Sequence, residues 1–320
     1  MKKILIIRFS SIGDIVLTTP VVRCLKQQMD VELHFLTKSA HKNILSPNPH
    51  VDKIWTIDEK IDEVIPDLKA EKYDHLIDLH HNLRTLHVKL HLGVPATSFP
   101  KLNIEKWLLT NLKINQLPNI HIVDRYFETV KKLDIKNDNA GLDYFIPPNE
   151  EIDTTEYGLI PNQYIAFAIG AKFATKRLPT HKIIKICKRL PHPIVLLGGK
   201  EDATNGNIIS KKSGTHVFNA CGQFSLHGSA SWVRQSRLLI THDTGLMHTG
   251  AAFKKRIISI WGNTVPAFGM YPYQTDYETI EVNNLKCRPC SKIGYVACPK
   301  GHFRCMEEID VEEVLEKILP

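Results

Sequence analysis

The sequence predicts an α/β protein with two doubly wound parallel sheets. Short apolar runs alternate with amphipathic segments, a pattern typical of parallel strands covered by helices on both faces. The alternation starts twice, and the proline-rich, acidic stretch 147–156 separates the two series. A chain of 320 residues most often forms two domains. We therefore expect an N-terminal domain at residues 1–150 and a C-terminal domain at 151–320, with a ligand cleft between them.

The N-terminal series begins with an apolar run that leads through Ser10-Ser-Ile-Gly-Asp14 into a helical pattern. Ser11 and Asp14 have the spacing of a capping box, and Pro20 predicts either a kink or a short first turn. Residues 103–115 are amphipathic and basic, which favours a core-facing helix over a membrane-surface helix. The predicted strands are 2–9, 31–37, 53–57 and 73–79, and a further helix is expected at 121–133.

The C-terminal series shows the same alternation. A helix is predicted from Thr180 to Leu190, with Thr180 as its cap. Another is expected from Leu246 to Phe253, and the last from Val311 to Leu319. The predicted strands are 164–169, 193–197, 216–218, 238–240 and 256–261, the last of which we expect to close the sheet.

Composition and missing motifs narrow the class of function. The net charge of +7 is spread along the chain without a zinc-finger or RNA-binding signature, so nucleic acid is excluded as a partner and an anionic small molecule or membrane surface fits better. No Gly-x-Gly-x-x-Gly follows the first strand and no P-loop occurs, which argues against dehydrogenases and P-loop kinases. Arg8 interrupts the first apolar run, so we predict no signal peptide and a cytoplasmic chain.

A turn between a strand and a helix is the leading candidate for a phosphate site. Asp243-Thr-Gly245 follows an apolar run and precedes the helical pattern at 246–253. The first N–H groups of a helix have no intrahelical partner, and the helix dipole favours an anion there. Gly245 permits close approach, Thr244 adds a hydroxyl, and helical spacing turns His248 the same way. The alternative is a simple helix cap with an ordinary histidine.

Four of the seven cysteines form a cluster near the C-terminus. Cys287, Cys290, Cys298 and Cys305 follow the pattern Cys-x2-Cys-x7-Cys-x6-Cys, and His302 lies among them. Four thiols are enough for tetrahedral zinc, but the spacing is not that of a zinc ribbon. The sequence therefore favours reduced structural cysteines over a metal site.

Five separated stretches, taken in order, resemble the family 9 glycosyltransferases, whose best-known members are the lipopolysaccharide core heptosyltransferases. They span nearly the whole chain. The stretches are Arg8-Phe-Ser-Ser-Ile-Gly-Asp14, Asp78-Leu-His-His-Asn-Leu-Arg84, His121-Ile-Val-Asp-Arg-Tyr126, Asp243-Thr-Gly-Leu-Met-His248 with Ala251-Ala252, and the cysteine cluster.

The resemblance implies a GT-B fold, with the acceptor bound mainly by the N-terminal domain and the nucleotide-sugar by the C-terminal one. It implies inverting transfer of a sugar, typically heptose from ADP-heptose, to the inner core of lipopolysaccharide. No cofactor or metal is expected, since the ADP-sugar is a substrate. In this fold the last helix often packs back on the N-terminal domain. Peripheral contact with the cytoplasmic face of the inner membrane would follow from a glycolipid acceptor.

The resemblance also suggests roles for individual residues. Asp14 matches the proposed general base, because inverting transfer needs a group that takes the acceptor hydroxyl's proton. Lys176 is the candidate cation for the departing diphosphate, with Lys172 or Arg177 as substitutes. The family usually has an aromatic pair where Arg177-Leu178 stands here. The remaining expected contacts are Glu201, Phe224, Asp243, Thr244, Gly245 and His248 for the donor, and Ser11, Gly13, Asn82 and Arg84 for an anionic acceptor.

Several alternatives remain open at the level of sequence. Asp14 can be a helix-capping residue, Lys176 a solvated loop lysine and Phe224 a core residue. The same fold can use another nucleotide-sugar or glycan acceptor, which the altered Arg177-Leu178 pair makes credible. A non-catalytic paralogue that binds a nucleotide-sugar is a third possibility, and an epimerase of nucleotide-sugars a fourth. Sequence does not indicate the oligomeric state.

Overall fold

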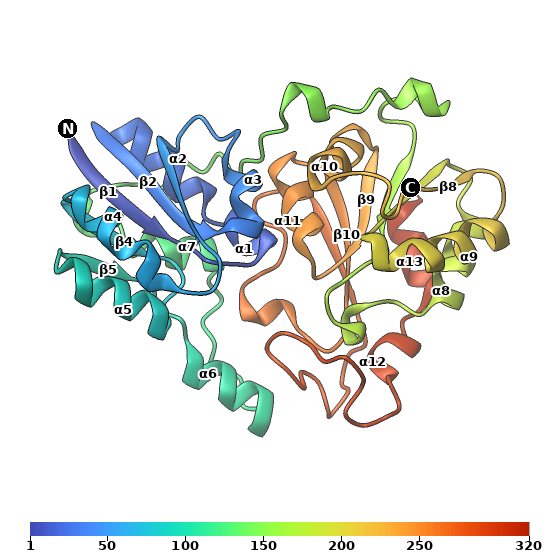
Figure 1. The fold of residues 1–320 in the computed structure, drawn as a ribbon. Coiled ribbons are helices and arrows are strands. Elements are labelled where there is room, and N and C mark those ends of the chain that lie inside the picture. The colour runs from blue at the N-terminus through green and yellow to red at the C-terminus, as the bar shows by residue number, and fades with distance from the viewer. Residues whose placement is uncertain (320) are drawn as a thin grey trace. The chain divides into compact units, whose positions relative to one another are not determined.

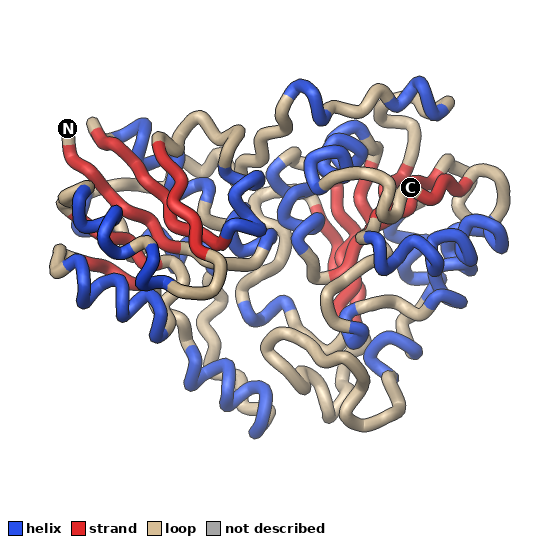
Figure 2. The backbone as a smooth tube through the Cα atoms, in the orientation of Figure 1, coloured by secondary structure: helices blue, strands red, loops and turns tan. Residues whose placement is uncertain are grey.

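The computed structural model describes residues 1–319, which form two compact units (Figure 1). Unit 1 contains residues 1–102 and 120–145, and unit 2 contains residues 103–119 and those from 146 onward. Each unit has one parallel sheet with helices around it, as the strands and helices of Figure 2 show. The predicted class, α/β with two parallel sheets, is therefore confirmed.

Unit 1 contains a five-stranded parallel sheet in the order β3-β2-β1-β4-β5. Its strands are β1 Lys2–Ile7, β2 Val31–Lys38, β3 Lys53–Ile57, β4 His75–Asp78 and β5 Ala96–Ser98. Its helices are α1 Ile12–Val16, α2 Thr19–Gln28, α3 Lys42–Leu45, α4 Ile65–Ala70, α5 Leu83–Leu92 and α7 Ile122–Phe127, with 3-10 turns at Ser39–His41, Ile61–Glu63 and Lys131–Leu133.

The central position of β1 fixes where unit 1 can bind a ligand. Ile4, Leu5, Ile6 and Ile7 are fully buried, because β1 pairs with β2 on one side and β4 on the other. The chain proceeds from β1 to β2 and β3 in one direction and then resumes at β4 in the other. Ligands of such sheets bind where the order reverses, beyond the carboxyl ends of the strands. In unit 1 this point lies after β1 and β4.

Unit 2 contains a six-stranded parallel sheet in the order β11-β10-β9-β6-β7-β8. Its strands are β6 Ile165–Ala168, β7 Ile194–Leu197, β8 Val217–Asn219, β9 Leu238–His242, β10 Arg256–Trp261 and β11 Tyr277–Glu281. Its longer helices are α8 Thr180–Arg189, α9 Ala203–Ser213, α10 Leu226–Gln235, α11 Gly245–Ala252 and α13 Val311–Ile318. By the same argument, the reversal point lies after β6 and β9.

Shorter elements of unit 2 join these strands or extend from them. They are α6 Asn103–Trp107, the π-helical turn η3 Leu108–Leu112, α12 Arg304–Glu307, and the 3-10 turns Pro148–Glu150, Thr154–Tyr157, η7 Ala174–Lys176, η8 Lys200–Asp202 and Pro266–Phe268. The resemblance implied that the last helix often packs on the N-terminal domain. In the structure this helix is α13, and its Val314, Leu315 and Ile318 lie in the core of unit 2.

Two sequence-based expectations need correction at the sheet edges. The strand at Arg256–Trp261 does not close its sheet, because β11 pairs with it from Ile257 to Trp261. In unit 1, β5 extends the sheet beyond β4. Both missed strands are edge strands. Their sequences, Ala-Thr-Ser and Tyr-Glu-Thr-Ile-Glu, lack the continuous apolar run that marks a strand buried on both faces.

The first helical pattern is divided in two. α1 ends at Val16 and α2 begins at Thr19, with Pro20 in its first turn. Proline is accepted there because the first N–H groups of a helix have no intrahelical partner. Pro20 therefore marks a first turn, which is one of the two expected outcomes.

Candidate functional site

Asp14 lies at the reversal point of unit 1 and is held by two neighbours. Its Oδ2 accepts hydrogen bonds from the Ser11 backbone N–H at 3.0 Å and from the Ser11 hydroxyl at 2.7 Å. Its Oδ1 forms an ion pair with the Arg8 guanidinium. The side chain of Asp14 is 18% exposed, so it remains partly accessible at the end of β1. The predicted Ser11–Asp14 capping interaction is present, and it orients the carboxylate.

Arg8 is a buried cation whose position sequence analysis did not identify. Its Nε donates to Ser10 O at 2.9 Å, another nitrogen donates to Leu79 O, and the guanidinium lies 5.9 Å from the ring centre of Tyr126. Burial opposes the charged form, but Asp14 and the other surrounding groups outweigh it and raise the pKa of Arg8. Arg8 thus links the end of β1, the end of β4 and Asp14. Its place in Arg8-Phe-Ser-Ser-Ile-Gly-Asp14 was the available signal.

The second part of the unit 1 site is the turn after β4, organised by Asp78. This carboxylate is fully buried. Its Oδ1 accepts from the backbone N–H groups of His80 at 3.0 Å and His81 at 2.6 Å, and Oδ2 lies 3.0 Å from Lys89 Nζ. Both carboxylate oxygens of Asp78 have hydrogen-bond or ion-pair partners within the fold, so its contribution is to fix the shape of the turn.

The predicted acceptor residues lie in the turns after β1 and β4 and differ in burial and bonding. Asn82 caps α5: its Oδ1 accepts from the Thr85 N–H at 3.0 Å, and the Thr85 hydroxyl oxygen accepts from the Asn82 N–H at 2.9 Å. Arg84 is exposed and has no ion pair within the described part of the chain. Ser11 is exposed and Gly13 is buried in α1. Arg84 is therefore the cation here that is available to an anionic ligand.

His80 is a further group at this edge. Its ring packs against Phe9 with the ring centres 5.1 Å apart. Burial, reinforced by the cations Arg8 and Lys101, lowers the pKa of His80 to about 4. The imidazole is consequently neutral at pH 7, so it adds a hydrogen-bonding group to the surroundings of Asp14 without a second positive charge.

In unit 2, Lys176 and Asp243 meet at the reversal point after β6 and β9. Lys176 Nζ lies 2.6 Å from Asp243 Oδ2 and 3.2 Å from Asp243 O. Thr264, which follows β10, donates its hydroxyl to the same Oδ2 at 2.8 Å. The side chains of Lys176 and Asp243 are 16% and 12% exposed. Sequence analysis selected the first two residues but not Thr264.

The start of α11 adds backbone donors beside this cluster. Thr244 is the N-cap residue, with extended backbone, and its side chain makes no capping hydrogen bond. Its hydroxyl lies 3.3 Å from that of Thr241. Gly245 begins the helix, and His248 lies one turn further on and is only 2% exposed. The helix terminus therefore provides positive partial charge at this edge of the sheet, beside the Lys176–Asp243 ion pair.

His242 holds this region together from within the core. Its Nε2 accepts from the Leu178 N–H at 2.9 Å, which ties the loop that carries Lys176 to the end of β9. Burial lowers the pKa of His242 to about 4, so the ring stays neutral and can accept at neutral pH. The stretch Thr241-His-Asp243 contained this residue, but a buried acceptor cannot be distinguished there from an exposed histidine.

The turn after β7 contributes two carboxylates with different surroundings. Asp202 is buried, accepts from the Gly199 N–H at 2.9 Å, and lies 3.2 Å from the Arg177 guanidinium. A methyl group on Gly198 would come within 2.7 Å of Asp202, so this close packing requires glycine. Glu201 is exposed beside Gly199. Glu201 is thus the accessible carboxylate of the pair.

Phe224 lies in an aromatic cluster rather than beside Lys176. Its ring centre is 5.8 Å from that of Tyr157 and 5.7 Å from that of Trp232, and the side chain is half-buried. This packing supports a core role for one face of the ring.

The cysteine cluster folds as a loop against the donor-side candidates. All seven cysteines are free thiols. Cys287 Sγ lies 3.8 Å from His302 Nε2, and burial raises the pKa of Cys305 to about 12. Among residues 1–319, the group of three potential metal ligands within 4.8 Å of one another is Glu32, His34 and Glu71 in unit 1.

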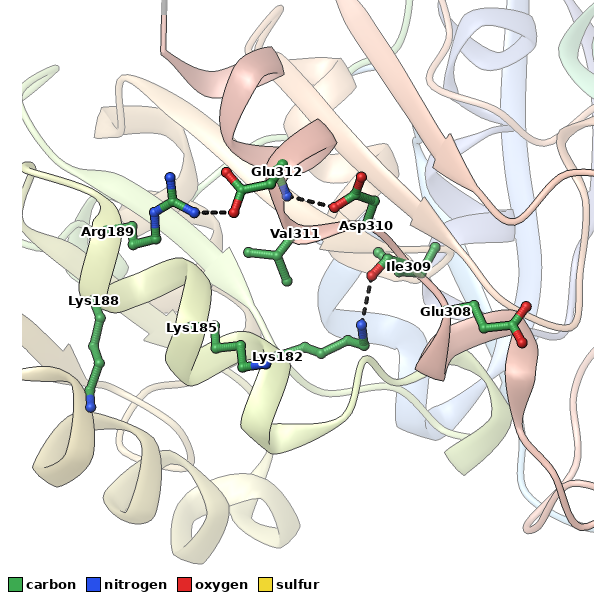
Figure 3. Close-up of a pocket in the computed structure, with 9 residues that line it drawn as sticks. All are labelled: Lys182, Lys185, Lys188, Arg189, Glu308, Ile309, Asp310, Val311 and Glu312. Atoms are coloured by element: carbon green, nitrogen blue, oxygen red, sulfur yellow. Dashed lines mark hydrogen bonds and ion pairs between the residues drawn. The ribbon is translucent and has the colours of Figure 1, made fainter.

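A surface groove between α8 and α13 lies apart from all predicted site residues. It measures about 620 Å³ (Figure 3). The Lys182 ammonium donates to Ile309 O at 2.7 Å, and Arg189 pairs with Glu312. These two cations interact with Glu312 of α13 and with the backbone of the turn before it. The groove is therefore the packing boundary between the two helices. Its lining residues are Lys182, Lys185, Lys188, Arg189, Glu308, Ile309, Asp310, Val311 and Glu312.

Comparison with known proteins places this chain among sugar transferases. Residues 62–299 match the family described as glycosyltransferase family 9 (heptosyltransferase). The chain is 23% identical to lipopolysaccharide heptosyltransferase 1 of Campylobacter coli over 99% of this chain and 98% of that protein.

Solved structures show the same fold. A glycosyl transferase family 9 protein from Veillonella parvula has a TM-score of 0.81 at 23% identity, covering 99% of this chain and 96% of that one. The ADP-heptose lipopolysaccharide heptosyltransferase II of Escherichia coli has a TM-score of 0.74 at 21% identity, with 99% and 97% covered. The expected GT-B fold is confirmed at this level.

Proposed function

Because the chain belongs to glycosyltransferase family 9, it is a glycosyltransferase, and we propose that it transfers heptose from ADP-heptose to the inner core of lipopolysaccharide. The observation that carries the proposal is the Lys176–Asp243–Thr264 cluster at the start of α11. A nucleoside diphosphate is the ligand that such a cation and helix terminus suit. The relatives named heptosyltransferases support the choice of sugar.

We assign the donor to the C-terminal domain, residues 151–320. Lys176, Thr244 and Gly245 would stabilise the diphosphate, whose negative charge grows as it leaves. Asp243 would hold Lys176 in position, and Glu201 would accept hydrogen bonds from the ribose hydroxyls. Phe224 would line the nucleoside pocket with its exposed face. His248 is buried, so its part would be to support the start of α11.

We assign the acceptor to the N-terminal domain, residues 1–150. Asp14 would act as general base: the acceptor hydroxyl oxygen attacks the anomeric carbon and its proton passes to the Asp14 carboxylate. The bond from that carbon to the diphosphate oxygen breaks, and its electron pair leaves with ADP. Displacement from the opposite side inverts the anomeric configuration. Ser11, Gly13 and Asn82 would shape this turn, while Arg84 would bind an anionic group of the acceptor.

Replacement of Asp14 by asparagine tests the proposal. Asparagine can still accept from Ser11, but it cannot take a proton. We expect kcat for heptose transfer to fall by about 10²–10⁴, while ADP affinity measured by calorimetry stays unchanged. A melting curve should accompany the assay, since Arg8 loses its ion-pair partner. Unchanged kcat in a folded variant would rule out Asp14 as the base.

A nucleotide screen separates this function from its alternatives. Calorimetry with ADP, UDP, GDP and CDP should show selective binding of ADP, which also raises the melting temperature. Preference for another nucleotide would favour the reading in which Arg177 and Leu178 mark a different donor. Nucleotide binding without transfer to any inner-core acceptor would favour the non-catalytic paralogue.

A further inference from the structure

Two segments of unit 2 expose an unusual set of apolar side chains, which we call the Trp107 surface. The first segment is α6 with the turn that follows it, and the second is the loop that carries the cysteine cluster. Leu109 of the first segment is buried, so the helix does have a core-facing side. The exposed fractions are 73% for Ile104, 50% for Trp107, 54% for Leu112, 47% for Ile114, 62% for Ile293, 41% for Tyr295 and 84% for Val296.

Hydrogen bonds hold the two segments side by side. The Lys292 ammonium lies 3.4 Å from Asn103 O. Lys113, just after η3, donates to Pro289 O at 2.6 Å and to Thr110 O at 2.6 Å. These contacts join the beginning and the end of the first segment to the cysteine loop. The Trp107 surface is therefore one organised feature rather than two separate loops.

Cations outnumber acids around the surface. Residues 282–306 contain no aspartate or glutamate, and their cations are Lys286, Arg288, Lys292, Lys300 and Arg304. Two of these are paired with acids outside this stretch, Arg288 with Glu281 and Arg304 with Glu308. Residues 103–119 add Lys106 and Lys113 against the single acid Glu105. Lys286 and Lys300 are exposed and make no ion pair within the described residues. Exposed apolar groups bordered by cations are complementary to an anionic lipid surface.

We propose that the Trp107 surface docks this protein on an anionic phospholipid membrane, with Trp107, Ile293 and Val296 entering the head-group layer. Indole and phenol rings favour that layer because one end is apolar and the other polar. A soluble protein rarely leaves so many large apolar groups exposed together without an occupant. The proposal rests on the proposed function, in which the acceptor is a glycolipid.

The loop that carries the cysteine cluster forms hydrogen bonds with the turns of unit 2 that carry the proposed donor residues. Tyr295 donates its backbone N–H to the Thr175 hydroxyl at 2.8 Å and accepts from the Thr175 N–H at 3.2 Å. Thr175 precedes Lys176 in η7. The Cys290 N–H also donates to Asn263 O, beside Thr264. Membrane contact would thus be made by the same loop that supports the turns carrying Lys176 and Thr264.

Vesicle sedimentation of the full chain tests the proposal. We would compare phosphatidylcholine vesicles with vesicles that also contain phosphatidylglycerol, using wild type, the double variant Trp107→Ser/Val296→Ser, and Ile160→Ser as matched control. Ile160 is 57% exposed in unit 2 but lies outside the surface. We expect wild type and the control to bind the anionic vesicles in a salt-sensitive way, and the double variant to bind roughly tenfold or more weakly.

Other outcomes would overturn the proposal. If the double variant binds vesicles as well as wild type, or if Ile160→Ser loses as much binding, the Trp107 surface is not responsible for vesicle binding. A Trp107-dependent dimer without vesicle binding would assign the surface to a second copy of the chain. Should the double variant fail to fold, the charge reversal Lys286→Glu/Lys300→Glu, with the same expected loss, replaces it. Retained binding in that variant would also contradict the proposal.

Two further readouts separate this inference from the proposed function. ADP binding by calorimetry should be the same in wild type and the double variant. Absence of vesicle binding in a wild-type protein that transfers heptose to a delipidated acceptor would defeat docking alone. Vesicle binding without ADP binding would defeat the proposed function alone. The fluorescence of Trp107 should shift to shorter wavelength with anionic vesicles, and Trp107→Phe should abolish that shift.

Discussion

Single residues at both candidate sites have a structural role beside the chemical role proposed for them. Asp14 completes the Ser11 interaction with one oxygen and the Arg8 ion pair with the other. One carboxylate oxygen of Asp243 accepts hydrogen bonds from the Lys176 ammonium and the Thr264 hydroxyl. An oriented carboxylate or ammonium needs no reorganisation when a substrate arrives, and such preorganisation is a large part of electrostatic catalysis. Capping and catalysis are therefore compatible assignments.

Lys176→Met should separate a donor contact from a solvated lysine. Methionine keeps much of the chain length but removes the charge, so we expect kcat/KM for the donor to fall by about 10²–10³. Lys172→Met is the matched control: Lys172 lies 5.6 Å from the Phe173 ring centre and makes no ion pair within residues 1–319. Steady-state kinetics with varied donor measures both. Equal effects at the two positions would argue against a specific role for Lys176.

Prediction from sequence worked well for residues whose neighbours follow in the chain. The Ser11–Asp14 interaction and the Asp243-Thr-Gly245 turn both depend on local spacing. Sequence analysis did not identify the roles of Arg8, Thr264 and His242. Each of them contacts a residue distant in sequence: Leu79, Asp243 and Leu178, respectively. A sequence shows that a buried polar residue needs a partner, but only the fold supplies that partner.

At the scale of elements, α5 provides a test of what Asn82 does. Asn82→Ala removes the cap and should lower the free energy of unfolding by about 1 kcal/mol, while Asn82→Asp retains an accepting oxygen and should keep stability. Urea denaturation measures this. If Asn82 also contacts the acceptor, Asn82→Asp should raise the acceptor KM despite its normal stability. An unchanged KM would leave Asn82 with the capping role alone.

The central strands and two edge strands, β3 and β8, were predicted, whereas the edge strands β5 and β11 were not. β1, β6, β7 and β9 are buried on both faces, so they appear as continuous apolar runs. β5 and β11 have a neighbour on one side only, and their polar sequences do not differ from those of loops. The predicted helix at 103–115 is shorter and ends in a π-helical turn, because Lys113 adopts a left-handed backbone with φ of 61°.

At the scale of the whole molecule, no helix within residues 1–319 combines the length and apolar character needed to cross a bilayer. The strength of the lipid contact proposed above would depend on ionic strength, because exposed lysines interact with anionic lipids over about a Debye length.

Two separate ion-pair clusters of unit 1 should make its stability depend on pH. Hydrogen bonds from Lys3 and then Lys53 lower the pKa of Glu71 to about 2, and the Arg23 hydrogen bond lowers that of Asp138 to about 2. A carboxylate with a depressed folded-state pKa stabilises the fold above its unfolded pKa, about 4, and loses that contribution as the pH falls toward 2. Unit 1 should therefore weaken in this window.

Glu71→Gln tests the prediction. At pH 7 we expect it to lower the free energy of unfolding by about 1–2 kcal/mol, since two ammonium groups lose their partner in a partly solvated network. The gap from wild type should close as the pH approaches 2. Urea denaturation at pH 7, 4 and 2.5 would measure it. A gap independent of pH would show that ionisation of Glu71 is not the cause.

Histidines extend the acid sensitivity to higher pH. Burial keeps the pKa of His80 and His242 near 4, below the unfolded value of about 6.5. The unfolded chain binds more protons than the folded one between these values, so stability declines as the pH falls from about 6.5 to 4. The slope of unfolding free energy against pH in this range should diminish in His242→Gln, which cannot take up the proton.

The assignment of residues 103–119 to unit 2 bears on how this chain can be dissected. The polypeptide leaves unit 1 after residue 102, returns at 120 and leaves again after 145, so the two units are joined by three covalent crossings. A fragment cut at a single point near residue 150 would carry α6 without the Pro289 carbonyl that Lys113 contacts. Separate production of the units would need residues 103–119 replaced by a short spacer in one fragment and grafted onto the other.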